Sequence, residues 1–308
     1  MQLAAEKQYP PDSPQGESAE GLEGKTDTAE EKEITFTEQV VADNEKCKIT
    51  ITGFERDDEW GIFYINTLLE NKSSDKTYTF SLDSSTVNIN GVTIYAFPDI
   101  GHELAPGEKR NEKFELYDFA LNYNDIGDYT DIELVFQVYN YNRKKVNVLE
   151  RKTVHIYPYG EDKAAEFVRE AQPSDKIILD NEYVTVIFAG ECNEKFKEFY
   201  SSEYMFEMFV INKTDKVILI RCYPDSFSVN GQEEIGSWYT KVHGGKCSFS
   251  TISFYNKKED LEKYGIKDYE DFKEIKFKFF IIDSGIDDDG FYYGENNKLS
   301  EHEITLNP

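Results

Sequence analysis

A run of carboxylates near the C-terminal end of the chain has the residue types that bind calcium. Asp283, Asp287 and Asp289 lie close together, and Gly285 and Gly290 allow the chain to bend. Calcium takes about six to eight oxygen ligands, which carboxylates on a bent loop can supply. An EF-hand register with Gly290 in sixth place, however, puts a glycine at the first ligand position and an asparagine at the last. Two interpretations stay open: a solvated hairpin loop, or a calcium site with Asp283, Asp287 and Asp289 as ligands.

Two adjacent aromatic residues offer a second kind of chemistry. Sandwich domains bind glycans by stacking sugar rings on exposed aromatic side chains. Trp238 and Tyr239 are neighbours in a segment that we place at a strand edge or in a loop. Core packing is the simpler interpretation of this pair, and ligand stacking by Trp238 and Tyr239 is the alternative.

The four histidines show no metal-binding or catalytic spacing. His102, His155, His243 and His302 are far apart and form no HExxH pair. Nucleophile-elbow, P-loop and dinucleotide-binding motifs are absent from the sequence as well. We therefore predict that the protein is not an enzyme and that it has no cofactor other than the calcium considered above. A hydrolase with a dispersed triad that includes His243 is the catalytic alternative, because such triads are defined by geometry and not by chain order.

Charge and length limit the partners and the organisation of the chain. It has 308 residues, with 60 acidic and 34 basic side chains and a formal net charge of −26. Such an acidic surface repels nucleic acid, so we exclude it as a partner. No apolar run approaches the roughly 18 residues of a membrane-spanning helix, so we expect no transmembrane segment. At about 100–200 residues per domain, the length predicts two domains.

Residues 1–33 differ in composition from the rest of the chain. They are rich in proline, glycine, serine and acidic residues and contain few large apolar side chains. Such a segment cannot bury enough surface to offset the entropy of ordering, so we expect a disordered acidic tether. It also lacks the basic start and apolar centre of a signal peptide.

Four short motifs occur twice in the same order. Such an internal repeat indicates two copies of one domain. We therefore expect domains at residues 34–158 and 176–308, joined by a short linker at 159–175. The repeated pairs are Asp43–Glu45 with Asp180–Glu182, Asn71–Lys76 with Asn212–Lys216, Val87–Gly91 with Phe227–Gly231, and Ile132–Val138 with Ile275–Ile281.

Within each copy, apolar residues alternate with polar residues, which is typical of half-buried strands. Asn90 and Gly91, flanked by apolar residues, are a strong hairpin signal because both tolerate positive φ. We expect each copy to fold as an immunoglobulin-like antiparallel β-sandwich. The clearest strand patterns run through Phe63–Leu69, Ile132–Val138, Tyr204–Val210 and Ile275–Ile281.

Short helical segments are expected between the strands. Lys257–Tyr264 ends at Gly265, a typical C-terminal cap, and Asp118–Asn124 is its counterpart in the first copy. These segments predict a short helical crossover in each sandwich. Glu161–Ala171 also has helical spacing and precedes Pro173, which predicts a partly rigid linker.

The cysteines leave the redox compartment open. Cys47, Cys192, Cys222 and Cys247 contain no CxxC pair. Free, mostly buried thiols are favoured, because cysteine packs like a small apolar residue. A disulfide between Cys222 and Cys247 in an oxidising compartment is the alternative.

Several of the repeated motifs occur together in a known family. In the second copy they are Asp180–Glu182, Asn212–Lys216, Ser228–Gly231, Gly244–Lys246, Leu261–Ile266 and Phe279–Asp283; in the first copy they are Asp43–Glu45, Trp60–Gly61, Asn90–Gly91 and Pro106–Gly107. With this set, residues 34–308 resemble a tandem immunoglobulin-like domain of uncharacterised extracytoplasmic proteins and lipoproteins of Gram-positive bacteria. The resemblance implies a cell-surface or secreted location and brings no catalytic residues. No lipid-attachment cysteine lies near the start. We therefore expect the leader or lipid anchor to be absent from this sequence.

The sequence thus predicts a non-enzymatic cell-surface or secreted protein that acts as an interaction or spacer module. Its expected partner is an unknown protein or a cell-envelope component. A ligand-binding module for glycan or calcium on the same scaffold is the alternative, and an envelope-associated hydrolase is the second alternative.

Overall fold

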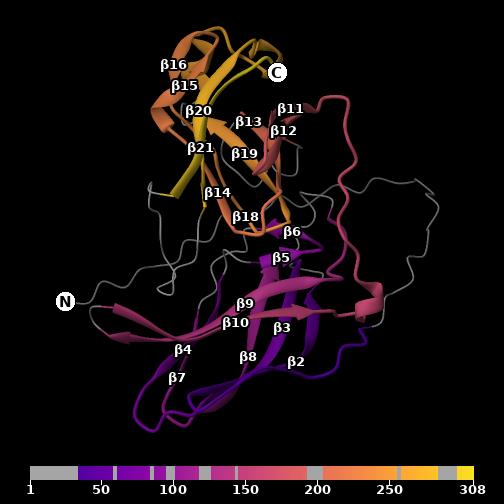
Figure 1. Cartoon of the computed structure of the whole chain (residues 1–308), viewed down its shortest axis with the longest axis vertical. Coiled ribbons are helices and arrows are strands. Elements are labelled where there is room, and N and C mark those ends of the chain that lie inside the picture. Colours follow the sequence, from indigo (N-terminus) through magenta and orange to yellow (C-terminus); the bar gives the residue numbers. More distant parts are fainter. Residues whose placement is uncertain are drawn as a thin grey trace, which may run out of the picture. The chain divides into compact units, whose positions relative to one another are not determined.

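β-Strands account for most of the described structure. The computed structural model describes residues 34–57, 61–83, 87–94, 101–117, 126–142, 145–192, 204–254, 258–283 and 297–308. Strands dominate these residues, and the helices among them are short, so the prediction of an all-β fold is confirmed (Figure 1). Ile34–Pro308 form one compact unit. The tether predicted for residues 1–33 and the helix predicted for 118–124 lie outside the described residues.

The strands of residues 34–158, the N-terminal half, belong to two sheets. They are β1 (Gln39–Asp43), β2 (Cys47–Asp57), β3 (Ile62–Asn71), β4 (Tyr78–Leu82), β5 (Val87–Ile89), β6 (Val92–Ile94), β7 (His102–Leu104), β8 (Lys109–Tyr117), β9 (Ile132–Asn142) and β10 (Lys145–Ile156). One sheet has four strands in the order β1-β2-β3-β8. The order β6-β5-β9-β4-β7, with β10 beside β9, is part of an eleven-stranded sheet.

The strands of residues 176–308, the C-terminal half, repeat this order. They are β11 (Lys176–Asp180), β12 (Val184–Glu191), β13 (Met205–Asn212), β14 (Ile218–Cys222), β15 (Phe227–Val229), β16 (Gln232–Glu234), β17 (Gly236–Ser237), β18 (Tyr239–Val242), β19 (Cys247–Phe254), β20 (Ile275–Asp283) and β21 (Lys298–Leu306). The order β11-β12-β13-β19 corresponds to the four-stranded sheet of the N-terminal half. The six-stranded sheet has the order β16-β15-β20-β14-β18, with β21 beside β20. It corresponds to the order β6-β5-β9-β4-β7, with β10 beside β9, in the N-terminal half.

The apolar faces predicted for the long strands are buried. Phe63, Ile65 and Leu69 in β3 are fully inaccessible, and the residues of the other face, Tyr64, Asn66 and Leu68, are partly exposed. Phe277 and Phe279 are equally buried in β20. Buried apolar residues gather into a main cluster in each half, one running from Val41 to Ile156 and the other from Val184 to Leu306. Each half therefore surrounds a core of its own.

Asn71 and Asn212 make the same hydrogen bonds in the two halves. The Nδ2 of Asn71 donates to three backbone carbonyl oxygens at 2.8–3.1 Å, and that of Asn212 to three at 2.7–3.0 Å. Each Oδ1 accepts the backbone N–H two residues further on at 2.9 Å. Both side chains are buried. Each asparagine therefore ties two loops of its own half together, which explains physically why these motifs recur.

The hairpins predicted at the Asn-Gly pairs are confirmed. Asn90 and Asn230 both have φ of 51°, and the following glycines have φ of 84° and 81°. These positive values form the tight turns between β5 and β6 and between β15 and β16. The Oδ1 of Asn230 accepts the N–H groups of Lys273 and Glu274 at 2.8 and 3.1 Å. The Oδ1 of Asn90 accepts those of Thr130 and Asp131 at 3.2 and 3.0 Å. Each turn is therefore also fixed to a neighbouring loop.

The helix predicted before Gly265 is present as α3 (Lys258–Glu262). The N–H groups of Gly265 and Ile266 donate to the carbonyl oxygens of Glu262 and Leu261 at 3.0 and 3.1 Å. With Gly265 at φ 83° and Leu261 and Ile266 buried, this is a Schellman cap. Nowhere in the described ranges is a helix long and apolar enough to cross a membrane.

The helix predicted for Glu161–Ala171 is wrong. Within this fully described segment, helix is confined to the 3₁₀ turn η2 (Glu161–Lys163). An α-helix needs each N–H for the carbonyl oxygen four residues earlier. The N–H of Ala165 instead donates to a threonine hydroxyl at 3.0 Å, and that of Phe167 to the carbonyl oxygen of Asn90 at 2.7 Å. Tertiary hydrogen bonds have replaced the helical ones.

Candidate functional site

Asp283 lies at the end of β20 and forms an ion pair. Its Oδ2 is 2.6 Å from Nζ of Lys216, and its side chain is 18% exposed. The hydrogen bond that Lys216 donates to Asp283 raises the pKa of Lys216. Asp287 and Asp289 lie outside the described residues, so calcium binding by these three carboxylates stays a prediction. Among the residues that the structure does describe, no group of three or more His, Cys, Asp or Glu is placed to hold a metal ion.

Trp238 is a core residue, which corrects its prediction as a ligand-stacking ring. It is 1% exposed, and its Nε1 donates to Oγ of Ser250 at 3.0 Å. Its ring meets Phe279 and Phe277 edge-on, with centroids 4.8 and 5.8 Å apart. A ring enclosed in this way has no face open to a sugar.

Tyr239 follows Trp238 directly and is the first residue of β18. Because side chains alternate along β18, the buried Thr240 and Val242 face inward and Tyr239 faces outward, where it is 44% exposed. It stands opposite Arg221 in the pairing of β18 with β14. Its role in ligand stacking stays a prediction, now attached to the outer face of the six-stranded sheet.

A hollow of about 160 Å³ opens on this outer face. Leu219 from β14 and Phe280 and Ile282 from β20 form its floor, as a small apolar cluster separate from the main core. Tyr223 packs beside the floor, with its ring centroid 4.9 Å from that of Phe280. Arg221, Cys222 and Pro224 complete the lining. We call the site formed by these seven residues the outer-sheet hollow.

Two cations flank the outer-sheet hollow. Nζ of Lys298 lies 5.2 Å from the ring centroid of Phe280 and 5.6 Å from that of Tyr223. It donates to the Tyr223 hydroxyl at 2.9 Å and to Glu301 at 2.7 Å. Arg221 is exposed and makes no ion pair or side-chain hydrogen bond with any other residue of the described ranges. The hollow is thus an apolar depression with a positive rim.

The matching positions of the N-terminal half are polar or carry a hydroxyl. The pairing of β4 with β9 corresponds to the pairing of β14 with β20. Phe80 opposite Val138 is the equivalent of Ile220 opposite Ile281. The apolar floor and its arginine are therefore particular to the C-terminal half. On this register, Thr79, Ser81, Gln137 and Tyr139 take the places of Leu219, Arg221, Phe280 and Ile282.

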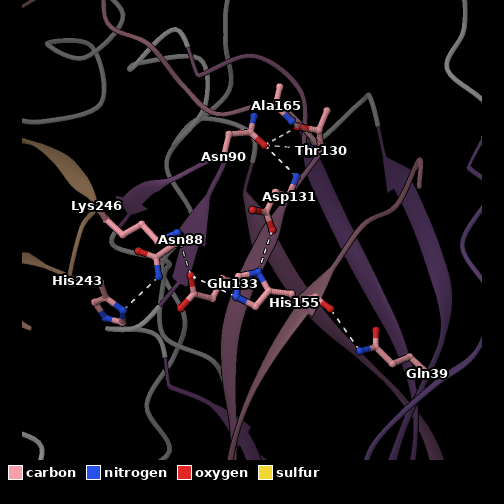
Figure 2. Close-up of polar contacts among 10 residues, drawn as sticks. All are labelled: Gln39, Asn88, Asn90, Thr130, Asp131, Glu133, His155, Ala165, His243 and Lys246. Atoms are coloured by element: carbon pink, nitrogen blue, oxygen red, sulfur yellow. Dashed lines mark hydrogen bonds and ion pairs between the residues drawn. The ribbon is translucent and has the colours of Figure 1, made fainter. Parts of the chain in front are cut away.

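A second set of polar side chains joins the two halves where β6 meets β19 (Figure 2). Nδ1 of His243 lies 3.1 Å from Nδ2 of Asn88, and the backbone N–H of His243 donates to Oγ1 of Thr93 at 3.1 Å. Ser248 Oγ donates to the carbonyl oxygen of Thr93 at 3.0 Å. A catalytic histidine stands between a hydroxyl and a carboxylate, whereas the Asn88 contact joins the loop after β18 to strand β5. These contacts give His243 a connecting role, and the hydrolase stays a prediction.

Charged side chains continue this junction. Lys246 lies 3.3 Å from Glu133, and Glu133 lies 3.7 Å from Nε2 of His155 (Figure 2). Nδ1 of the same histidine is 3.3 Å from Asp131. The ring of His155 is 44% exposed, so water screens these pairs and each contributes little to stability. These side chains lie next to one another without forming an enclosed site.

The prediction of free thiols is confirmed. All four cysteines are unbridged, and Cys47, Cys192 and Cys222 are buried. Burial raises the pKa of Cys47 and of Cys247 to about 11. Because the thiolate is the reactive form of cysteine, these two side chains are poor nucleophiles at neutral pH.

Comparison with known proteins gives no family. No model of a protein family matches the chain, and no curated protein matches it. The crystal structure of a 7S globulin from Momordica charantia is 11% identical, covers 70% of this chain and 81% of its own, and has a TM-score of 0.12. That of vicilin from Corylus avellana (hazelnut) is 5% identical, covers 70% and 79%, and has a TM-score of 0.12. Likenesses at this TM-score carry no argument.

Sequence reasoning missed the outer-sheet hollow, although a signal for it exists. Phe279–Ile282 in β20 are four apolar residues in succession, so both faces of the strand are apolar there. The matching segment of β9, Phe136–Tyr139, has a glutamine at its second position. When the alternation of apolar and polar residues is lost in just one of the two copies, that copy has a second apolar surface.

Proposed function

We propose that the protein is a non-enzymatic interaction module of the cell surface, built from two tandem immunoglobulin-like β-sandwiches. The C-terminal sandwich carries the recognition surface, and the N-terminal sandwich acts as a spacer. The observation that carries this proposal is the outer-sheet hollow, where an apolar floor and an exposed arginine replace the polar residues of the other half. An apolar depression with a polar rim is typical of the centre of a protein interface.

Three features support the tandem arrangement. The strand order of each sheet recurs in the other half, from β1-β2-β3-β8 to β11-β12-β13-β19 and from β6-β5-β9-β4-β7 to β16-β15-β20-β14-β18. Each half has its own main core cluster. Asn71 and Asn212 tie equivalent loops with equivalent hydrogen bonds. Two antiparallel sheets around a shared core are the architecture of a β-sandwich.

The cell-surface location is tested with the native protein. Cytosol, envelope and medium are separated, and mass spectrometry determines the N-terminus of the protein in each fraction. We expect a processed or lipid-modified start in the envelope or the medium. An unprocessed Met1 found in the cytosol contradicts the surface location.

The interaction role is tested by cross-linking in the same cells. A photoreactive amino acid replaces Tyr239, which is exposed beside the hollow, and in a control it replaces Glu103, which is exposed on the corresponding strand β7. We expect one adduct of defined mass from position 239 and none from position 103. Equal adducts from both positions, or none from position 239, contradict the proposed recognition surface.

A further inference from the structure

We infer that the outer-sheet hollow binds one aromatic side chain of a protein segment that carries carboxylates next to that aromatic residue. This inference rests on the proposed interaction role and specifies the chemistry of the partner. It follows from the size of the hollow, from its lining and from the charge at its rim.

The size of the hollow suits a single ring. Its volume is about 160 Å³. An engineered apolar cavity of about 150 Å³ in another protein accommodates benzene, whereas sites for drug-sized ligands measure about 300–1,000 Å³. An aromatic side chain therefore fits, and a large cofactor does not. Protein interfaces concentrate their binding energy in such aromatic anchors.

The lining offers an aromatic guest apolar contact and ring faces. Leu219, Phe280 and Ile282 form an apolar cluster at the bottom of the hollow, and each is 2–5% exposed, so a guest contacts only a small part of this floor. Tyr223 is partly exposed, and its ring is tilted by 52° to that of Phe280. An added ring can pack on the floor and against the edge or face of Tyr223, which are the arrangements that aromatic pairs prefer.

The rim explains why carboxylates accompany the aromatic residue. Arg221 is exposed at the hollow, and its planar guanidinium can bind a carboxylate through two parallel hydrogen bonds. Lys298 is held over the two rings by the Tyr223 hydroxyl and by Glu301. The chain as a whole carries a charge of −26, but at physiological salt that field is screened beyond about 8 Å. Direct contacts at the rim therefore decide the preference.

The experiment uses the full chain, labelled with ¹³C at leucine and isoleucine methyl groups. It is titrated with three capped peptides: acetyl-Glu-Phe-Glu-amide, acetyl-Glu-Ala-Glu-amide and acetyl-Lys-Phe-Lys-amide. We expect the methyl signals of Leu219 and Ile282 to shift saturably with the first peptide, while those of Ile89, in the other half, stay constant. The other two peptides should bind at least tenfold more weakly.

Two variants borrow residues from the N-terminal half. Arg221→Ser introduces the residue type found at the matching position, Ser81. Phe280→Gln introduces the residue type found at its matching position, Gln137. We expect Arg221→Ser to remove the preference for the acidic over the basic peptide, and Phe280→Gln to weaken the binding of both Phe-containing peptides at least tenfold. Unchanged methyl signals of Ile252, which is buried in the core of the C-terminal half, show that this half is folded in both variants.

The outcomes separate this inference from the proposed function. Equal binding of all three peptides, no binding of the acidic aromatic peptide, or shifts away from Leu219 and Ile282 overturns the inference. If the acidic aromatic peptide does not bind but the adduct at position 239 forms, the interaction role is supported and the inferred chemistry of the partner is contradicted. If the peptide binds and no adduct forms, the hollow stands and the cell-surface role falls.

Discussion

Asn71 and Asn212 show how much of the structure depends on single buried side chains. The two amide hydrogens of each serve three backbone carbonyl oxygens in buried or partly buried surroundings. Replacing Asn212 with alanine leaves these acceptors unpaired and opens a small void. We expect Asn212→Ala to lower the free energy of unfolding by about 3 kcal/mol, measured by urea denaturation of the full chain. Asn71→Ala should have a similar effect on its own half.

An exposed asparagine provides the control for this prediction. Asn147 lies on β10 with its side chain open to solvent. Asn147→Ala should change the free energy of unfolding by less than about 0.5 kcal/mol. If Asn212→Ala unfolds at the same urea concentration as the unsubstituted protein, the asparagine does not hold the loops.

The raised pKa values of two thiols predict a pH dependence. Cys47 and Cys247 have pKa values of about 11 in the folded chain because they are buried, compared with about 8.5 for an exposed cysteine. Above pH 8.5 the unfolded chain loses these protons and the folded chain keeps them, so folding stability is full below that pH and falls as the pH rises towards 11. Cys47→Ala should reduce this loss, measured as urea midpoints between pH 8 and 11.

Thiol reactivity gives an independent check. In the folded protein at pH 8, Cys47 should react with a disulfide reagent at least a hundredfold more slowly than after denaturation, since it is both buried and protonated. Comparable rates in the two states contradict the burial of this side chain.

At the scale of elements, the linker is held by one ion pair. Arg169 binds Asp175 with two hydrogen bonds of 2.6 and 2.7 Å, and the two side chains are 11% and 13% exposed. The guanidinium also lies 5.3 Å from the ring centroid of Phe209. This pair fixes the segment that follows Phe167, whose N–H is bonded to Asn90. The linker is thus ordered by tertiary contacts rather than by helix.

Removing this pair should loosen the linker. The hydrogen bond from Arg169 lowers the pKa of Asp175, so the pair stabilises the fold above about pH 4 and its contribution is lost as the pH falls below that value. We expect Asp175→Asn to increase hydrogen exchange at the Phe167 amide at least tenfold at pH 7. Asp162→Asn, in an exposed pair with Lys163, should leave that exchange unchanged. An equal effect of both variants contradicts the prediction.

The elements also show what the sequence could reveal. The alternation in β3 and in the first half of β20, the Asn-Gly turns and the cap at Gly265 are local signals, and all are present in the structure. The spacing in Glu161–Ala171 is equally local, but distant hydrogen-bond acceptors overrode it. Whether Trp238 faces inward depends on strand register, and the outer-sheet hollow depends on which side chains meet across β14 and β20. Those features are set by pairing, which a single sequence does not display.

At the scale of the whole molecule, two cores are joined by a narrow junction. The junction pairs Val92 with Cys247 in a single parallel bridge, and Ser248 adds a buried hydrogen bond to Thr93. The Oγ1 of Thr93 also accepts the N–H of His243 at 3.1 Å and donates to Asn88 at 2.7 Å. These contacts are few compared with those within each core. We therefore expect the two halves to unfold in separate transitions, with each folded half stabilising the other across the junction.

Thr93→Val tests this coupling, because it keeps the shape of the side chain and removes its hydroxyl. The N–H of His243 and the Oδ1 of Asn88 each lose a partner, which costs about 2 kcal/mol. Because these groups lie between the halves, the half with the lower urea midpoint should lose about that much free energy of unfolding. The methyl signals of Ile89 in one half and Ile220 in the other report the two transitions. Thr153→Val, at an exposed position of β10, should leave both midpoints unchanged. A single shared transition for Ile89 and Ile220 in the unsubstituted protein would show that the two cores form one inseparable unit, and the spacer role of the N-terminal half would fall with it.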